Sequence, residues 1–354
     1  MDLLLHSLRA PAKNARHFYS CFQACILPPN FLTGSLKVAK LRRWAPAVMV
    51  TITVMITGAS GTIGAALAQA LAARSDTIVV CLSRSPVELP GVGSATAIVK
   101  VQGDFANRAD LDRALSLVGR PVDACVHMAA ITSPGNGTEE QLECNLVGTH
   151  ALVSHLAEHG GCRKFVLASS IAATGCLNTE FRPLELPIPD EHPCLDGAGY
   201  GASKYLMEEL SRYLSRQNSA LDIICLRIAA IVADDAVIEP ISLDQHLPSS
   251  PPLIVSLGRM RMGDMLRCLE LCIDRRYRPG SMQVLNAVHP CTQLGEGTHI
   301  ADLLRKWWGD KDVGLIAGIG SLRDTEGVWE WRTARDELGF IAQLPVVGSS
   351  VSKL

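Results

Sequence analysis

The sequence predicts an α/β fold in which helices cover both faces of a doubly wound parallel sheet. Short apolar runs rich in β-branched residues alternate with helix-period segments between residues 52 and 228, and this alternation is typical of a parallel sheet. A glycine-rich turn separates the first apolar run from the first helical segment. In such sheets a turn of this kind leads into a helix whose N-terminus binds phosphate.

The elements can be expected in order along the chain. The apolar runs predict strands at 52–56, 78–82, 97–101, 124–126, 164–168 and 222–228, the last of which closes the series. The helix-period segments predict helices at 65–73, 108–118, 145–159 and 200–215. A proline-rich stretch at 176–198 predicts a surface excursion, which we expect to cover the mouth of the active site. Beyond residue 231 we expect a short strand at 284–287 and helices at 262–273, 300–308 and 333–338.

These elements divide the chain into four parts. Residues 1–48 are expected to be a non-domain extension. Residues 49–230 form a dinucleotide-binding domain of the Rossmann type, and residues 231–345 form a small C-terminal substrate lobe. Residues 346–354 form a flexible tail, because Gly348, Ser349 and Ser350 precede its end.

Charge and cysteine spacing exclude several classes of function. The net charge of −2 gives no indication of nucleic acid as a partner, and no apolar run is long enough to span a bilayer. The 12 cysteines show no Cys-x-x-Cys pairs and no accompanying histidine cluster. We therefore expect reduced thiols, no metal site and no membrane partner.

The two ends of the chain carry conflicting targeting signals. Residues 1–48 hold seven Lys or Arg residues against one acid, Asp2, and such a basic leader resembles a mitochondrial presequence. Alternatively, translation starts at Met49 and the leader is not part of the protein. The C-terminal Ser352-Lys353-Leu354 is a peroxisomal import signal that a receptor reads. Because this signal is specific and position-locked, we expect a peroxisomal protein, with the cytoplasm as the alternative and the mitochondrion less favoured.

The glycine turn predicts a dinucleotide site. Gly58 permits the tight turn, Gly61 lets a pyrophosphate approach the backbone, and Gly64 lets the helix pack close to the strand. The dipole at the helix N-terminus favours the phosphates. The expected contacts in this turn therefore also include Ser60, Thr62 and Ile63.

The end of the second strand predicts the type of cofactor. NAD-binding folds usually place an acidic residue there to bind the ribose 2′-hydroxyl. Here the position holds Ser83, followed by Arg84. A guanidinium attracts a 2′-phosphate that a carboxylate would repel, so NADP is favoured over NAD.

Later strand ends supply further candidate contacts. Asp104, next to Phe105, stands where it could bind the adenine amino group, or it could cap the helix that follows. Ala129 follows a central strand and leaves room for the cofactor, and Asn145 begins the next helix. His127 is expected to be structural rather than catalytic.

Tyr200 and Lys204 lie four residues apart and therefore share one helix face. An unperturbed tyrosine, with a pKa near ~10, is a poor acid or base at neutral pH. A nearby ammonium and a positively charged nicotinamide would favour the phenolate and lower that pKa. Ser170, at the end of a predicted strand, can hydrogen-bond the same substrate oxygen. These three residues are the candidate catalytic set.

The ordered motifs resemble the extended short-chain dehydrogenase/reductase family, in its NAD-dependent epimerase/dehydratase branch. The matching residues are Gly58-x-x-Gly61-x-x-Gly64, Gly103-Asp104, His127-x-Ala129-Ala130, Asn145-x-x-Gly148-Thr149, Ser169-Ser170, Tyr200-x-x-x-Lys204 and Leu226-Arg227. The resemblance implies that Ser170, Tyr200 and Lys204 are a catalytic triad, with Lys204 also reaching the nicotinamide ribose. It also implies a homodimer formed through the helices that begin at Asn145 and Tyr200.

Two departures from the family pattern bear on the substrate. Sugar-nucleotide members usually carry asparagine three residues after the Leu-Arg pair, and this chain has Ala230 there. The stretch between Arg227 and Asp264 is also short for a lobe that grips a nucleotide. We therefore expect an NAD(P)-dependent oxidoreductase acting on a small alcohol or carbonyl compound, such as a sugar acid. An epimerase or dehydratase without net cofactor turnover and a non-catalytic nucleotide-sensing module are the alternatives.

Overall fold

Seven parallel strands form the central sheet of the computed structural model, which describes residues 51–92, 97–132, 137–178, 180–195, 199–243, 253–291, 294–324 and 326–343. The strand order is β3-β2-β1-β4-β5-β6-β9, and every neighbouring pair is parallel. Most strand residues are buried, as expected for a sheet covered on both faces. The strands are β1 Ile52–Thr57, β2 Thr77–Ser83, β3 Ile98–Gln102, β4 Ala124–His127, β5 Lys164–Ser170, β6 Asp222–Ile228 and β9 Met282–Ala287.

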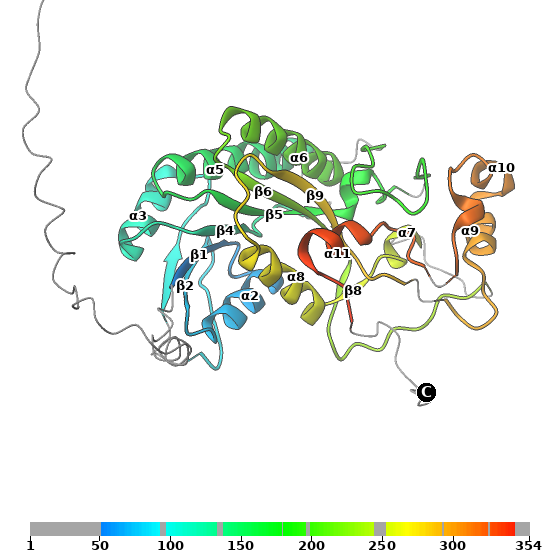
Figure 1. Cartoon of the computed structure of the whole chain (residues 1–354), viewed down its shortest axis with the longest axis horizontal. Helices are drawn as coiled ribbons and strands as arrows, with labels where there is room; N and C mark the ends of the chain where they lie inside the picture. The colour runs from blue at the N-terminus through cyan, green and yellow to red at the C-terminus, as the bar shows by residue number, and fades with distance from the viewer. Residues whose placement is uncertain are drawn as a thin grey trace, which may run out of the picture. The chain divides into compact units, whose positions relative to one another are not determined.

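Helices cover both faces of this sheet, which confirms the predicted doubly wound, Rossmann-like architecture (Figure 1). In β1, Val54 and Ile56 pack in one core cluster and Met55 in the other, because successive strand residues point to opposite faces. The first cluster includes α2 and α8, and the second includes α3, α5 and α6. These helices are α2 Thr62–Ala72, α3 Arg108–Val118, α5 Thr149–Glu158, α6 Gly199–Gln217 and α8 Met262–Asp274.

Two sequence-based expectations about the strands and helices are wrong. The strand at 222–228 does not close the series, because β9 pairs with the free side of β6 and becomes the edge strand. The helix expected to begin at Asn145 begins earlier: α4, Thr138–Leu142, leads through a π-helix, Glu143–Gly148, into α5. Asn145 therefore lies inside a continuous helical segment.

The C-terminal part adds short elements around the sheet. A second, two-stranded sheet pairs β7 with β8. The excursion that follows β5 joins this part through isolated bridges between Glu185 and Ala317 and between Ile188 and Trp329. The short elements of the C-terminal part are β7 Ile231–Val232, α7 Leu253–Ser256, β8 Met260–Arg261, α9 Ile300–Trp308, α10 Asp310–Val313, the 3₁₀ helix Ile319–Ser321 and α11 Arg332–Leu338. One further 3₁₀ helix, Ile171–Thr174, directly follows β5.

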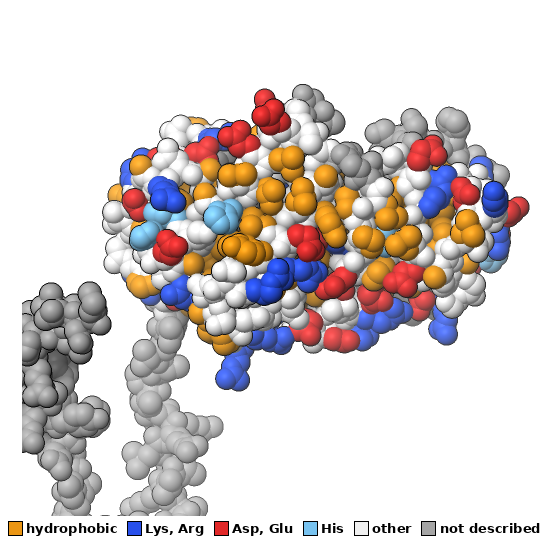
Figure 2. Space-filling view, turned by 90° about the horizontal axis from the view of Figure 1, so that it is seen from above, with side chains coloured by type: hydrophobic (Ala, Val, Ile, Leu, Met, Phe, Trp, Pro, Cys, Tyr) orange, Lys and Arg blue, Asp and Glu red, His pale blue; other side chains and the backbone are white. Residues whose placement is uncertain are grey.

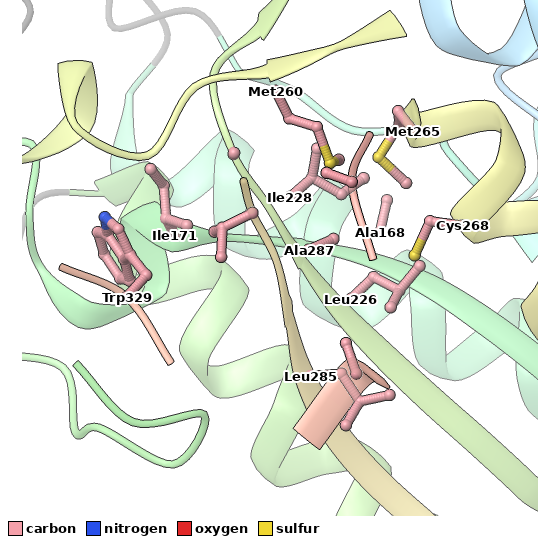
Figure 3. Packing of buried hydrophobic residues seen from close by; sticks show 14 of the residues in the cluster. Ala168, Ile171, Leu226, Ile228, Met260, Met265, Cys268, Leu285, Ala287 and Trp329 are labelled. Atoms are coloured by element: carbon pink, nitrogen blue, oxygen red, sulfur yellow. The ribbon is translucent and has the colours of Figure 1, made fainter. Parts of the chain in front are cut away.

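One core cluster joins the C-terminal part to the sheet. Figure 3 shows Met265 and Cys268 of α8 near Leu226 and Ile228 of β6, with Trp329 close to Ile171. All six side chains are less than a tenth exposed. Residues beyond 231 therefore supply both a strand, β9, and a packed helix, α8, to the main sheet.

The two predicted end segments, 1–48 and the tail 346–354, lie outside the described residues. Among the helices that the structure describes, none combines the length and the apolar character needed to cross a bilayer.

Candidate functional site

The glycine turn between β1 and α2 is closely packed. Gly58 adopts φ +68°, and a Cβ atom there would lie 2.6 Å from the Ala129 backbone nitrogen. A Cβ atom on Gly64 would lie 2.3 Å from the Gly58 carbonyl oxygen. The N-cap of α2 is Gly61, so no side chain at this position accepts a hydrogen bond from the first N–H groups of the helix. The turn therefore has the close packing and the helix N-terminus that a pyrophosphate site requires.

A pocket of about 210 Å³ opens beside this turn. Seven predicted cofactor contacts line it: Gly58, Ser60, Gly61, Ser83, Arg84, Phe105 and Ala129. The other predicted contacts are not among its lining residues: Thr62, Ile63, Gly64, Asp104, Asn145, Tyr200 and Lys204. Gly64 is buried in the packing between turn and helix, and Thr62 is exposed at the start of α2.

Six lining residues were not among the predicted contacts: Leu82, Ser85, Gly103, Met128, Ala130 and Cys144. Five of them are within two residues of a predicted contact at the end of a strand. The sequence pattern therefore identified the right strand ends, although not every residue there. Cys144 differs because it reaches the pocket from the π-helix. A cysteine on an unrecognised helix has no sequence pattern that would identify it.

Hydrogen bonds fix the wall of the pocket at the end of β2. The hydroxyl oxygens of Ser60 and Ser83 are 2.6 Å apart, which joins the glycine turn to β2. Gln102 Nε2 donates to the Arg84 carbonyl oxygen at 3.0 Å. The Arg84 backbone is thereby held at the pocket, where its guanidinium remains exposed.

Asp104 occupies a local turn rather than a helix cap. Its Oδ1 accepts from the Ala106 N–H at 2.9 Å, and its own N–H donates to Asp110 Oδ2 at 2.8 Å. Asn107 is the N-cap of α3, where its Oδ1 accepts from the Ala109 and Asp110 N–H groups. The alternative expectation that Asp104 caps this helix is therefore wrong, because the residue nearest the helix start performs that role.

His127 is a buried structural residue, as expected. Its Nδ1 lies 2.6 Å from Thr57 Oγ1 and its Nε2 lies 3.0 Å from Thr149 Oγ1, so both ring nitrogens have partners. Phe105 packs against the imidazole with ring centroids 4.7 Å apart. Burial lowers the pKa of His127 to about 3, so the ring is neutral at physiological pH.

Asn145 connects the loop after β4 to the helix that carries Tyr200. Its Oδ1 accepts from the Ile131 N–H at 2.8 Å, and its Nδ2 donates to the Ile131 carbonyl at 3.0 Å. Nδ2 also donates to Ser203 Oγ at 2.9 Å, and Ser203 Oγ donates to the Tyr200 carbonyl at 2.8 Å. In this chain the Asn145 side chain is therefore engaged by the Ile131 backbone and the Ser203 hydroxyl.

The structure brings Ser170, Tyr200 and Lys204 together. Ser170 ends β5, and its hydroxyl accepts from the Ala172 N–H at 3.1 Å. Ser170 also lies close enough to Tyr200 to act on the pKa of its phenol. Lys204 is buried, donates from Nζ to the Ala168 carbonyl at 2.7 Å and lies 5.9 Å from the centroid of the Tyr200 ring.

In the surroundings that the protein itself supplies, the pKa of Tyr200 is raised rather than lowered. Burial of the phenol raises its pKa, because the phenolate loses solvation, and Ser170 acts on that pKa in the lowering direction. Burial also lowers the pKa of Lys204 to about 8. The protein surroundings thus favour the protonated phenol of Tyr200 and make the Lys204 ammonium lose its proton more readily.

No group of three or more His, Cys, Asp or Glu side chains suited to a metal ion occurs within the described part of the chain. The cysteines described there are free thiols, and burial raises the pKa of most of them, including Cys125 and Cys225.

Comparison with known proteins identifies relatives of this chain. The model of the NAD dependent epimerase/dehydratase family matches residues 54–238, just over half of the chain. UDP-glucose 4-epimerase 2 of Arabidopsis thaliana is 29% identical over 188 residues, which are 49% of this chain and 50% of that protein. Sterol demethylase protein B of Methylococcus capsulatus is 33% identical over 127 residues, 35% of this chain and 36% of that protein. The chain spans about half of the length of such relatives or less.

The fold also matches solved structures. A crystal structure of UDP-glucose 4-epimerase from Bifidobacterium longum in complex with NAD+ and UDP superposes with a TM-score of 0.58 at 19% identity. The match covers 83% of this chain and 94% of that one. The family match covers the glycine turn, the pocket and the Ser170–Tyr200–Lys204 arrangement within one segment. The chain therefore belongs to the NAD-dependent epimerase/dehydratase family.

Proposed function

We propose that the protein is an NAD(P)-dependent oxidoreductase that interconverts a small alcohol and its carbonyl compound. The observation that carries this proposal is the junction of Ser170, Tyr200 and Lys204 at the end of β5. Ser170 acts there to lower the pKa of the Tyr200 phenol, and the buried Lys204 holds its Nζ 5.9 Å from the centroid of the Tyr200 ring. This is the residue set that a carbonyl or hydroxyl needs for proton transfer.

The described residues fit a dinucleotide. The close contacts that a Cβ atom would make at Gly58 and Gly64, the uncapped start of α2 and the adjacent pocket suit a pyrophosphate. When bound, the nicotinamide would accept or donate the hydride. Ser170 would hold the substrate oxygen, Tyr200 would move the proton on that oxygen, and Lys204 would favour the anionic form of Tyr200 during the transfer.

A matched pair of phenylalanine variants tests this function. Tyr200→Phe removes the proposed proton donor, and Tyr205→Phe removes a hydroxyl from the same helix. We expect wild-type protein and Tyr205→Phe to change nicotinamide absorbance with at least one compound from a panel of small alcohols and carbonyls. Tyr200→Phe should lose about 10²-fold or more in kcat. Equal turnover by the Tyr200→Phe variant would refute the assignment.

A second candidate is an epimerase that oxidises and re-reduces its substrate within one turnover. The similarity to UDP-glucose 4-epimerase favours it, whereas the apolar Ala230, in place of the asparagine of sugar-nucleotide members, disfavours a UDP-sugar. Product formed without a net absorbance change would select the epimerase. A net change in absorbance with substrate would select the oxidoreductase.

For the cofactor, we propose NADP in preference to NAD. Ser83, Arg84 and Ser85 line the pocket at the end of β2, and no Asp or Glu occurs among the described lining residues. A 2′-phosphate would therefore meet a cation and hydroxyls rather than a carboxylate. Dissociation constants for NADPH and NADH test this directly, and equal or tighter binding of NADH would contradict it.

We further propose that two copies of the chain associate through the face formed by α5 and α6. Figure 2 shows hydrophobic side chains gathered on the side of the molecule that these helices cover. Val147, Leu206 and Tyr213 are 60%, 40% and 48% exposed, respectively. A charged Leu206→Glu/Tyr213→Glu variant should halve the mass measured by light scattering, and Leu315→Glu should not. A monomeric wild-type protein would refute this proposal.

For location, we propose import into peroxisomes through Ser352-Lys353-Leu354, which lie outside the described residues. A tagged protein that lacks these three residues should remain in the cytoplasm. Continued peroxisomal import would show that the signal lies elsewhere.

A further inference from the structure

A buried ion pair that the proposed chemistry does not use lies next to the three candidate catalytic residues. Glu208 of α6 and Arg227 of β6 each have side chains that are only 1% exposed. Arg227 Nε donates to Glu208 Oε1 at 2.9 Å, and Nη2 donates to Oε2 at 2.8 Å. Two parallel bonds of this kind fix the relative orientation of the elements that carry them.

The pair lies on the buried face of the catalytic helix. Tyr200, Lys204 and Glu208 are spaced four residues apart on α6, so they lie one above the other. Lys204 and Glu208 are both buried there. The ion pair therefore anchors the helical turn that directly follows Lys204.

Two further hydrogen bonds extend the pair towards the site. The Ser169 hydroxyl, one residue before Ser170 on β5, donates to Glu208 Oε1 at 2.5 Å. Arg227 Nη2 also donates to the His192 carbonyl at 3.0 Å. The ends of β5 and β6, helix α6 and the excursion after β5 thus meet at one carboxylate and one guanidinium.

The excursion after β5 is in turn hydrogen-bonded to the C-terminal part of the chain. Its backbone forms hydrogen bonds from Leu186 N–H to the Ala317 carbonyl and from Ile188 N–H to the Val328 carbonyl, both at 2.8–2.9 Å. Arg227 therefore links the helix that carries Tyr200 to the segments that we expect to contact the substrate.

We propose that Glu208 and Arg227 are positioning residues, which hold Tyr200 in register with Ser170 and hold the excursion against the same helix. This inference rests on the proposed function, because it concerns the reaction of Tyr200. A buried ion pair is weak evidence for a role in stability, since an apolar pair of similar volume is often equally stable in a protein interior.

The Glu208 carboxylate also interacts electrostatically with the Lys204 ammonium. It raises the pKa of Lys204 and so opposes the lowering that burial causes. The other groups that face Lys204 are Tyr200 on its own helix, His127 on β4, Cys144 on the π-helix and Cys225 on β6. Cys144 and Cys225 act on the pKa of Lys204 in the same raising direction as Glu208. Burial raises the pKa of both thiols and His127 is neutral at physiological pH, so Glu208 is the carboxylate among these groups that favours the ammonium.

Two single substitutions test the positioning role, and the melting temperature of each is measured because Glu208→Gln leaves the buried Arg227 guanidinium without its anion. Ser169→Ala removes the bond from β5 to the pair, and Glu208→Gln removes the charge and keeps the shape. We expect kcat to fall by about ten-fold and up to about 10²-fold, respectively, because small misplacements of reacting groups have effects of this size. The dissociation constant for the cofactor should stay within about two-fold in both variants, because the cofactor pocket is not altered.

In Glu208→Gln the alkaline limb of the kcat–pH profile should move to lower pH, because Lys204 loses its proton more readily. Glu209→Gln, an adjacent exposed residue on α6, should behave as wild type.

A paired apolar substitution separates positioning from stability. Glu208→Leu/Arg227→Leu removes both charges together, and we expect its melting temperature to be close to that of wild type while kcat remains low. Wild-type kcat and an unshifted pH profile in this double variant would overturn the proposal. If the double variant does not fold, Ser169→Ala decides, because wild-type kcat in that variant would overturn the proposal by itself. Loss of turnover in Tyr200→Phe alongside wild-type behaviour of Ser169→Ala and Glu208→Gln would refute the positioning role and leave the proposed function standing.

Discussion

The hydroxyl oxygens of Ser60 and Ser83 lie 2.6 Å apart, so the glycine turn and the end of β2 are hydrogen-bonded across the pocket wall. This contact places two small neutral groups where a ribose would lie. An acidic side chain at position 83 would occupy the same place with a negative charge.

The Ser83→Asp substitution should therefore reverse the choice of cofactor. A carboxylate at this position accepts hydrogen bonds from a ribose diol and repels a 2′-phosphate. We expect the ratio of the NADPH to the NADH dissociation constant to rise by about 10²-fold or more, which corresponds to about 3 kcal/mol. Ser83→Asn, which is similar in shape but neutral, is the control and should change the ratio much less. A ratio that stays the same in Ser83→Asp would show that position 83 does not face the ribose.

Gly61 and Gly64 should respond differently to alanine. A Cβ atom on Gly64 would lie 2.3 Å from the Gly58 carbonyl oxygen, so Gly64→Ala should destabilise the fold by about 3 kcal/mol. A Cβ atom on Gly61 would meet only that same oxygen at 3.3 Å, and Gly61 lines the pocket. Gly61→Ala should therefore weaken cofactor binding with little change in melting temperature. Thermal unfolding and cofactor titration of both variants check this contrast, and the opposite pattern would contradict it.

His127 should make the protein sensitive to acid. Its folded-state pKa of about 3 is below its ordinary value of 6.5, so the unfolded chain binds this proton more readily. The stabilisation is complete above pH 6.5 and is lost as the pH falls towards 3. We expect about 2 kcal/mol of the free energy of unfolding to be lost from this group between pH 7 and pH 5.

The comparison of two histidine variants isolates this effect. In His127→Asn the change in unfolding free energy between pH 7 and pH 5 should shrink by about 2 kcal/mol. In His159→Gln, where the side chain is largely exposed, it should match wild type. Equal pH dependence in all three proteins would show that His127 does not titrate as described.

Lys204 should reduce stability even though we propose that it is needed for activity. Its pKa of about 8 is below the ordinary 10.5, so burial penalises the ammonium at neutral pH. Lys204→Met should raise the free energy of unfolding at pH 7 by about 1–3 kcal/mol, with the lost bond to the Ala168 carbonyl reducing the gain. The same variant should lose activity. The gain in stability should diminish above pH 8, where the wild-type lysine is neutral, and a variant less stable than wild type at pH 7 would contradict this account.

Much of the sheet could be predicted because each strand carries a local signal. The helix at 108–118 matches α3 because Asn107 caps its start and Gly119, at φ +65°, ends it. A strand was expected at 284–287, but its place beside β6 could not be predicted, because the sequence of a single strand does not indicate which neighbour it pairs with. α4 was missed because it is short and polar.

The site could be predicted in part for the same reason. The glycines of the turn and Ser83 follow strands directly, so the sequence indicates which sheet edge they share. The raised pKa of Tyr200 depends on burial by distant segments. Cys144 reaches the pocket through a helix type that has no simple sequence pattern. Tertiary packing decided these features.

The π-helix at Glu143–Gly148 fixes the number of residues between the start of this helical segment and α5. Each residue of an α-helix rotates the chain by about 100°, and a π-helical turn holds more residues than an α-helical one. Asn145 must face Ile131 and Ser203 from within this turn, while Leu152 and Leu156 of α5 must face the sheet core. Deletion of one residue here would rotate one set away from its partners. Length variation among homologues should therefore be tolerated in the surface loops and absent from this segment.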